Sequence, residues 1–72
     1  MKSIQEITAD KNKLNFQKII IERMIKDLKS LGIYSELYLW EKELVYVNES
    51  IDIVQWELEI HNLLVETNII SE

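Results

Sequence analysis

The sequence predicts an all-α protein, an antiparallel hairpin of two long helices that dimerises into a helical bundle. Three observations carry this prediction: a stretch from Glu36 to Glu66 without Gly or Pro, an apolar face at helical spacing before residue 32, and a single glycine, Gly32, between the two. Gly and Pro are the residues that most often interrupt a helix, so each half is able to form one continuous helix. We therefore expect a single small helical domain over residues 1–72.

The first helix is predicted from about residue 4 to residue 31. Ser3 and Glu6 form an S-x-x-E capping box at its start. Asp10 competes as the cap, because the polar cluster at 10–13 interrupts the apolar pattern. The expected buried face consists of Leu14, Ile21, Met24, Ile25, Leu28 and Leu31, widened by Phe16, Ile19 and Ile20.

A turn is predicted at residues 32–35. Gly32 can adopt the left-handed conformation that ends a helix, and Ile33 can supply the apolar contact that follows such a cap. Ser35 is expected to cap the next helix, with Glu36 in its first turn. A connection this short makes the two helices antiparallel neighbours.

The second helix is predicted from about residue 36 to residue 66. One row of side chains alternates at three and four positions, which is the spacing that keeps a helix stripe facing a partner helix. This row consists of Leu37, Trp40, Leu44, Val47, Ile51, Val54, Leu58, His61 and Val65. The polar segment Asn48–Ser50 is compatible with a kink, and residues 67–72 either fray or add a last turn.

A second apolar line on this helix points away from the first. Leu39, Tyr46, Ile53 and Ile60 lie beyond a polar line made by Glu43, Ser50 and Glu57. At about 100° per residue, a hairpin partner cannot cover both lines. We therefore expect a protein interface, for a homodimer or for a target protein, formed by Leu39, Tyr46, Ile53, Ile60, Trp56 and Leu63.

An α+β fold is the alternative, with a small antiparallel meander over residues 34–60. Val, Ile, Tyr and Trp favour strands, and the segment from Val54 to Ile60 alternates at period two. However, the required turns contain no Gly or Pro, and the apolar parity slips between Ile53 and Val54. The sequence favours the helical hairpin.

Charge is distributed unevenly along the chain. Residues 1–32 carry seven basic and four acidic side chains, a balance of +3, whereas residues 33–72 carry one basic and nine acidic side chains, a balance of −8. Such halves attract each other within a hairpin or between subunits. The alternative function is a nucleic-acid-binding accessory protein that uses the basic first helix, although the acidic remainder repels phosphates.

The residues that catalysis or metal binding needs are sparse. His61 follows Glu57 by one turn, but the E-x-x-H pattern of carboxylate-bridged metal bundles requires an acid where Leu58 stands. The chain has no cysteine, no serine in a nucleophile-elbow context and no glycine-rich phosphate loop. We expect no enzymatic activity, no cofactor and no metal; His61 is expected to set helix register as a polar residue in the row.

Location and origin follow from composition. The apolar runs are far shorter than the ~20 residues of a membrane span, and the N-terminal segment lacks the apolar region of a signal peptide. We therefore expect a cytoplasmic protein with no membrane contact. The high content of Ile, Lys, Asn and Glu suits an AT-rich bacterial or phage genome. The predicted function is a small regulator, inhibitor or assembly factor that binds another protein.

Overall fold

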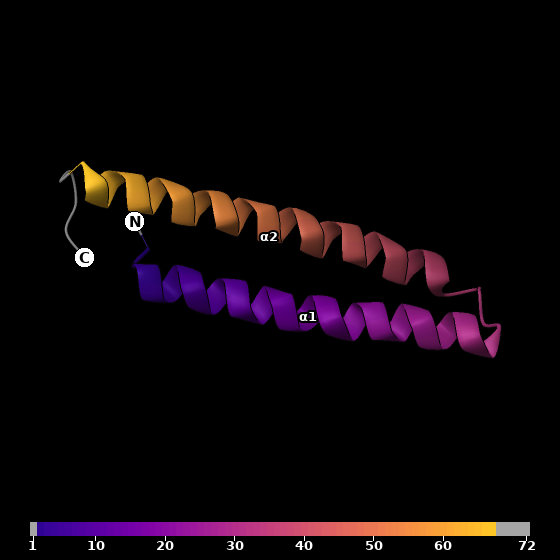
Figure 1. Cartoon of the computed structure of the whole chain (residues 1–72). Helices are drawn as coiled ribbons and strands as arrows, with labels where there is room; N and C mark the ends of the chain where they lie inside the picture. The colour runs from indigo at the N-terminus through magenta and orange to yellow at the C-terminus, as the bar shows by residue number, and fades with distance from the viewer. Residues whose placement is uncertain (1, 68–72) are drawn as a thin grey trace.

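Two long antiparallel helices lie side by side (Figure 1). The computed structural model describes residues 2–67, in which α1 spans Ile4–Leu31 and α2 spans Leu37–Glu66. These residues contain no strand, so the helical hairpin is confirmed and the α+β alternative for residues 34–60 is wrong. The molecule is a rod with extents of 55 × 15 × 14 Å.

The capping box forms at the start of α1. Ser3 is extended, with φ −70° and ψ 162°, and its Oγ accepts a hydrogen bond from the Glu6 backbone N–H at 3.2 Å. The Ser3 hydroxyl also donates to Glu6 Oε1 at 3.4 Å. Asp10, the competing cap, instead lies inside α1. The helix begins at Ile4 because Ser3 satisfies a backbone donor that the first turn leaves open.

Gly32 ends α1 as the sequence predicts. Its φ of 72° lies in the left-handed region, which costs a glycine little because it has no Cβ. The Gly32 N–H donates to the Lys29 carbonyl at 3.2 Å, and the Ile33 N–H donates to the Leu28 carbonyl at 3.0 Å. These two bonds form a Schellman motif, which satisfies carbonyls that the end of the helix leaves open.

The start of α2 differs from the prediction. Glu36, and not Ser35, is the N-terminal cap, and α2 begins at Leu37. Glu36 is in the right-handed helical region, with φ −100° and ψ −9°, and its side chain makes no capping bond within residues 2–67. The prediction is wrong because a turn closed by the bond from the Leu37 N–H to the Tyr34 carbonyl, 3.3 Å, leads into the helix and leaves Ser35 outside it.

The segment Asn48–Ser50 lies within α2, which continues through it without interruption. The Ser50 hydroxyl donates to the Tyr46 carbonyl at 3.0 Å, so its polar group is satisfied within the helix. At the end of α2, the Thr67 N–H donates to the Leu63 carbonyl at 3.0 Å. The tail predicted to fray or add a turn lies, from residue 68 onward, outside the described residues.

The core lies along the line where the two helices meet. All nine positions of the row predicted on α2, which we call the inner seam of α2, are buried or half-buried. Ile21 and Ile25 of α1 and Val47 of α2 form a buried cluster. Other side chains pack against this cluster: Leu37, Trp40, Leu44 and Ile51. A two-helix layer has little interior, and even these clusters keep some contact with solvent.

The buried face of α1 is narrower than predicted. Its inner seam consists of Ile4, Ile7, Lys11, Leu14, Lys18, Ile21, Ile25 and Leu28, which alternate at three and four positions and are all buried or half-buried. Five residues that the sequence places on the buried face are exposed, so their predicted placement is wrong: Met24, Leu31, Phe16, Ile19 and Ile20. The physical reason is that a single partner helix covers only one narrow stripe of α1, and two positions of that stripe are half-buried lysines. The Lys11 Nζ also donates to Gln55 Oε1 at 2.7 Å across the hairpin.

Replacing Val47 by Ala tests the inner seam against a matched position on the same helix. Val47 is 2% exposed and Val45 is 57% exposed. We expect Val47→Ala to lower the free energy of unfolding by roughly 1–3 kcal/mol, because it removes buried methyl groups and leaves a void. Val45→Ala should change it by less than about 0.5 kcal/mol. Urea denaturation measures both, and equal effects would contradict this seam.

Substitutions at Gly32 test the stop of α1. An added Cβ would meet no atom within 4 Å, so any cost comes from the backbone conformation alone. We expect Gly32→Ala to lower the free energy of unfolding by about 1 kcal/mol or more, because residues with a Cβ disfavour positive φ. Gly32→Asn should cost less, since Asn tolerates this region. Thermal denaturation of the two variants beside wild type gives the order, and a reversed order would show that the turn does not need the left-handed residue.

Candidate protein interface

The outer side of α2 carries a second row of residues at alternating three- and four-residue spacing. Trp56 follows Val47 by nine positions, which at about 100° per residue places it roughly 180° around the helix from the core. We call this row the outer seam. It consists of Leu39, Lys42, Tyr46, Glu49, Ile53, Trp56, Ile60 and Leu63. Six of these eight positions are apolar, and Lys42 and Glu49 are the two polar ones.

The outer seam contains all six residues that the sequence places at the interface. Five of them, Leu39, Tyr46, Ile53, Trp56 and Leu63, are between 58% and 64% exposed. The structure thus brings these five together on one accessible face of a single helix. Large apolar side chains exposed on one face are uncommon on the surface of a monomer, which makes this face a candidate site of association.

Ile60 is placed differently from the other five. It is half-buried and lines a cavity of about 190 Å³ where the start of α1 meets the end of α2. The other residues around this cavity are Lys2, Ile7, Trp56, Glu57 and His61. Ile60 therefore contributes to the hairpin itself as well as to the outer seam.

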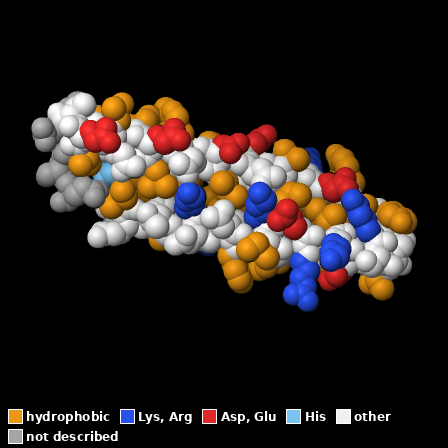
Figure 2. Space-filling model, viewed as in Figure 1, with side chains coloured by type: hydrophobic (Ala, Val, Ile, Leu, Met, Phe, Trp, Pro, Cys, Tyr) orange, Lys and Arg blue, Asp and Glu red, His pale blue; other side chains and the backbone are white. Residues whose placement is uncertain are grey.

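Acidic side chains flank the outer seam on both sides. Glu43 and Glu57 lie along one edge, two heptads apart. Asp52 and Glu59 lie along the other edge, one heptad apart. Figure 2 shows acidic side chains following α2 and Lys and Arg side chains following α1. The outer seam is therefore an apolar strip set in a negative field, which attracts cationic partners.

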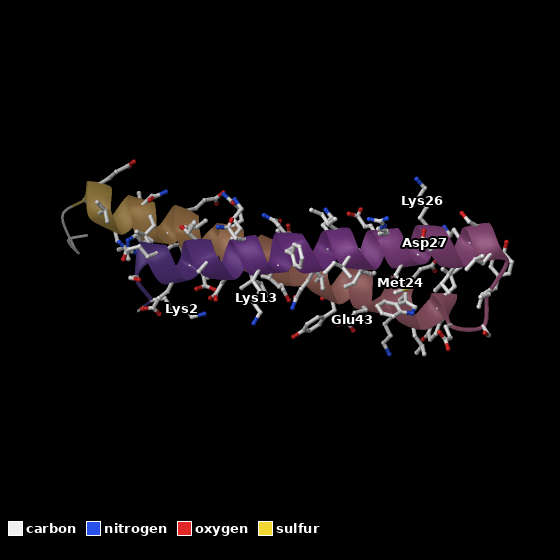
Figure 3. All side chains as sticks on the ribbon, turned by 90° about the horizontal axis from the view of Figure 1, so that it is seen from below. Lys2, Lys13, Met24, Lys26, Asp27 and Glu43 are labelled. Atoms are coloured by element: carbon white, nitrogen blue, oxygen red, sulfur yellow. The ribbon has the colours of Figure 1, made fainter. Side chains whose placement is uncertain are left out.

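A groove of about 520 Å³ opens between the two helices near the turn. Its wall on α1 is Gln17, Ile20 and Ile21, and its wall on α2 is Glu36, Leu39, Trp40, Glu43 and Val47. Figure 3 shows Glu43 on the same side of the hairpin as Met24 and Lys13, with Lys26 on the opposite side. Leu39 belongs to both the groove and the outer seam, so the two surfaces are continuous.

The outer side of α1 carries a shorter apolar patch that sequence reasoning missed. Phe16 and Ile19 are 64% and 63% exposed, and Ile20 is also exposed. The signal that could have found them is the inner seam of α1: once Lys11 and Lys18 are accepted as seam positions, Phe16 falls on the opposite side of the helix. Only three neighbouring positions are apolar there, far fewer than on α2.

His61 occupies a buried position near the end of the inner seam of α2. It is 5% exposed and lines the cavity that Ile60 shares. Its placement in the seam is confirmed, whereas its role in setting register stays a prediction. Among residues 2–67 there is no group of three or more His, Cys, Asp or Glu side chains arranged to hold a metal ion.

The N-terminal end of α1 carries an exposed ion pair. Lys2 Nζ donates to Asp10 Oδ2 at 2.8 Å, and this hydrogen bond and the Asp10 charge raise the pKa of Lys2 above its ordinary value. Because both side chains are solvated, the pair adds little stability. The pair neutralises the charge of Lys2, which lines the same cavity as Trp56 at this end of the hairpin.

No helix within residues 2–67 combines the length and the apolar character needed to cross a membrane. Comparisons of the chain with protein-family models, with curated proteins and with solved structures gave no match.

Proposed function

We propose that this protein is a small non-enzymatic protein-binding module, a regulator, inhibitor or assembly factor, that binds a partner through the outer seam of α2. The observation that carries the proposal is the exposure of Leu39, Tyr46, Ile53, Trp56 and Leu63 in one continuous row. Burial of side chains of this size stabilises an association by about 1.5–3 kcal/mol each before the costs of binding.

The composition of the outer seam supports this proposal. Aromatic anchors dominate the energetics of protein interfaces, and Trp56 and Tyr46 supply two of them at well-separated positions on the row. Acidic flanks add specificity, since they favour cationic partners and disfavour anionic ones. The occupant is either a second copy, which makes the homodimer expected from the sequence, or a target protein. The expected cytoplasmic location is part of the same proposal.

The double variant Ile53→Glu/Trp56→Glu tests the proposal. Both side chains are exposed, so the hairpin should keep its helical circular-dichroism spectrum, whereas Ile60 would be a poorer choice because it is half-buried. We expect the variant to lose a partner that the wild-type protein captures from its native host, with affinity for that purified partner lowered at least about 100-fold. Affinity capture with mass spectrometry, followed by calorimetry on the purified partner, measures the loss.

The matched control is Phe16→Glu/Ile19→Glu. It also places two carboxylates at exposed apolar positions, but on α1. Capture that survives in the control and fails in the α2 variant supports the proposal. If the two variants lose the partner equally, or if the α2 variant still binds it, the outer seam is not the docking surface.

The second candidate function is nucleic-acid binding through α1. It is favoured by the exposed Lys13, Arg23, Lys26 and Lys29, which could neutralise phosphates. Against it, α1 lies beside the acidic α2, which carries Lys42 as its one basic residue. The field of the whole hairpin is therefore repulsive to a polyanion.

We expect the protein to show no salt-sensitive retention of DNA or RNA at about 0.15 M salt, where exposed charges are screened beyond ~8 Å. Fluorescence anisotropy with labelled single- and double-stranded oligonucleotides, from low to high salt, measures this. An affinity that falls steeply with added salt would favour the nucleic-acid function over the protein-binding one.

A further inference from the structure

The spacing of the outer seam defines the shape of its occupant. From Leu39 to Leu63 the row alternates at three and four positions without interruption. This repeat keeps a stripe facing a second helix that crosses at a small angle, as in a left-handed coiled coil. An extended peptide or a flat surface would contact only some of these positions. The occupant that matches the whole row is an α-helix of about 25 residues, or roughly 37 Å.

The flanks of the outer seam define the charge of its occupant. Glu43 on one edge and Asp52 and Glu59 on the other are exposed, and Glu57 is half-buried. In a coiled coil these flanking positions lie beside the flanks of the opposing helix, so their charges set the choice of partner. Lysine or arginine at the facing positions would pair with all of them, whereas acidic residues would be repelled.

The same flanks argue against the α2 helix of a second copy. An antiparallel pairing that matches Leu39 with Leu63 and Tyr46 with Trp56 of the second copy places Glu43 beside its Glu57 and Asp52 beside its Asp52. Like charges at facing positions destabilise such a pair. A parallel pairing of the two α2 helices also brings carboxylates together, because both edges of the outer seam carry acidic residues. The apolar residues suit self-pairing, but the charges oppose it.

The α1 helix of a second copy matches the charge but not the length. Its outer side carries Phe16, Ile19 and Ile20 beside Lys13 and Arg23. This apolar patch covers little more than one turn, whereas the outer seam of α2 runs for seven turns. The two surfaces also lie on opposite sides of the hairpin, so their contact would not close into a dimer and would continue from copy to copy.

We propose that the outer seam of α2 binds a basic amphipathic helix of another protein, about seven turns long, with apolar residues at heptad spacing and Lys or Arg along both flanks. The inference rests on the proposed function and names the chemical class of its partner. The complex is a three-helix assembly in which α2 lies in the middle, packed by α1 on one side and by the partner helix on the other. The partner's basic flanks also keep it from pairing with itself.

Two synthetic 28-residue peptides test this inference. Both carry Leu and Ile at the heptad a and d positions; one has Lys and the other Glu at the e and g positions. Fluorescence anisotropy of the labelled peptides with the full chain gives the affinities. We expect the Lys peptide to bind at least tenfold more tightly than the Glu peptide, and the difference to shrink at high salt. Equal affinities would overturn the charge assignment.

Charge reversal on the protein gives a second, independent readout. The variant Glu43→Lys/Asp52→Lys/Glu59→Lys changes only exposed positions and leaves both seams intact. We expect it to prefer the Glu peptide, reversing the order seen with the wild-type chain. Ile53→Glu/Trp56→Glu should bind neither peptide, and Phe16→Glu/Ile19→Glu should bind the Lys peptide as the wild type does. An unchanged preference in the charge-reversed variant would overturn the inference.

The remaining outcomes separate this inference from the proposed function. If neither peptide binds but a host protein is still captured through the outer seam, the helical partner is wrong and the protein-binding function stands. Analytical ultracentrifugation of the chain alone separates a second outcome. If the chain forms a dimer, if Ile53→Glu/Trp56→Glu dissociates it, and if the Lys peptide does not displace it, the occupant is a second copy and the inference fails. If the chain instead associates into open-ended chains of copies, and Phe16→Glu/Ile19→Glu abolishes this association, the occupant is the α1 helix of another copy and the inference fails.

Discussion

The alternation of three and four residues along both facing helices is the constraint on which this structure depends. A two-helix layer has almost no interior, so its stability comes from one continuous line of contacts, with Ile21, Ile25 and Val47 at its centre. A seam residue that turned outward would remove a substantial part of these contacts. The strict spacing on both helices, including lysines at two positions of α1, follows from this need.

The bounds of α1 could be predicted because local chemistry fixes them. Ser3, Glu6 and Gly32 act within one turn of chain, and no distant contact is needed for their hydrogen bonds. The row from Leu37 to Val65 could be predicted equally well, because eight of its nine residues are apolar and the pattern repeats along nearly the whole of α2. Structure can be predicted from sequence where the signal is local or repeats over many residues.

The parts that could not be predicted depend on the partner helix or on competing local choices. Lys11 occupies a seam position, where it donates a hydrogen bond to Gln55 of α2, and the sequence of one helix alone does not show that contact. The apolar pattern alone places Met24 and Phe16 on the buried face, although the hairpin leaves them exposed. Ser35 and Glu36 both suit a helix start, and the backbone turn from Tyr34 decided between them. The sequence pattern singles out the six candidate interface residues, but only the position of α1 shows that five of them are exposed and that Ile60 is half-buried.

The rod shape has a consequence for how the assembly state of this protein has to be measured. The radius of gyration is 16.5 Å, against about 11 Å expected for a compact chain of this length. An elongated particle diffuses more slowly than a sphere of the same mass, so a single chain leaves a size-exclusion column early, at the volume of a larger globular protein. Calibration with globular standards would report a dimer where there is a monomer, and only methods that weigh the particle, such as light scattering or sedimentation equilibrium, count the chains.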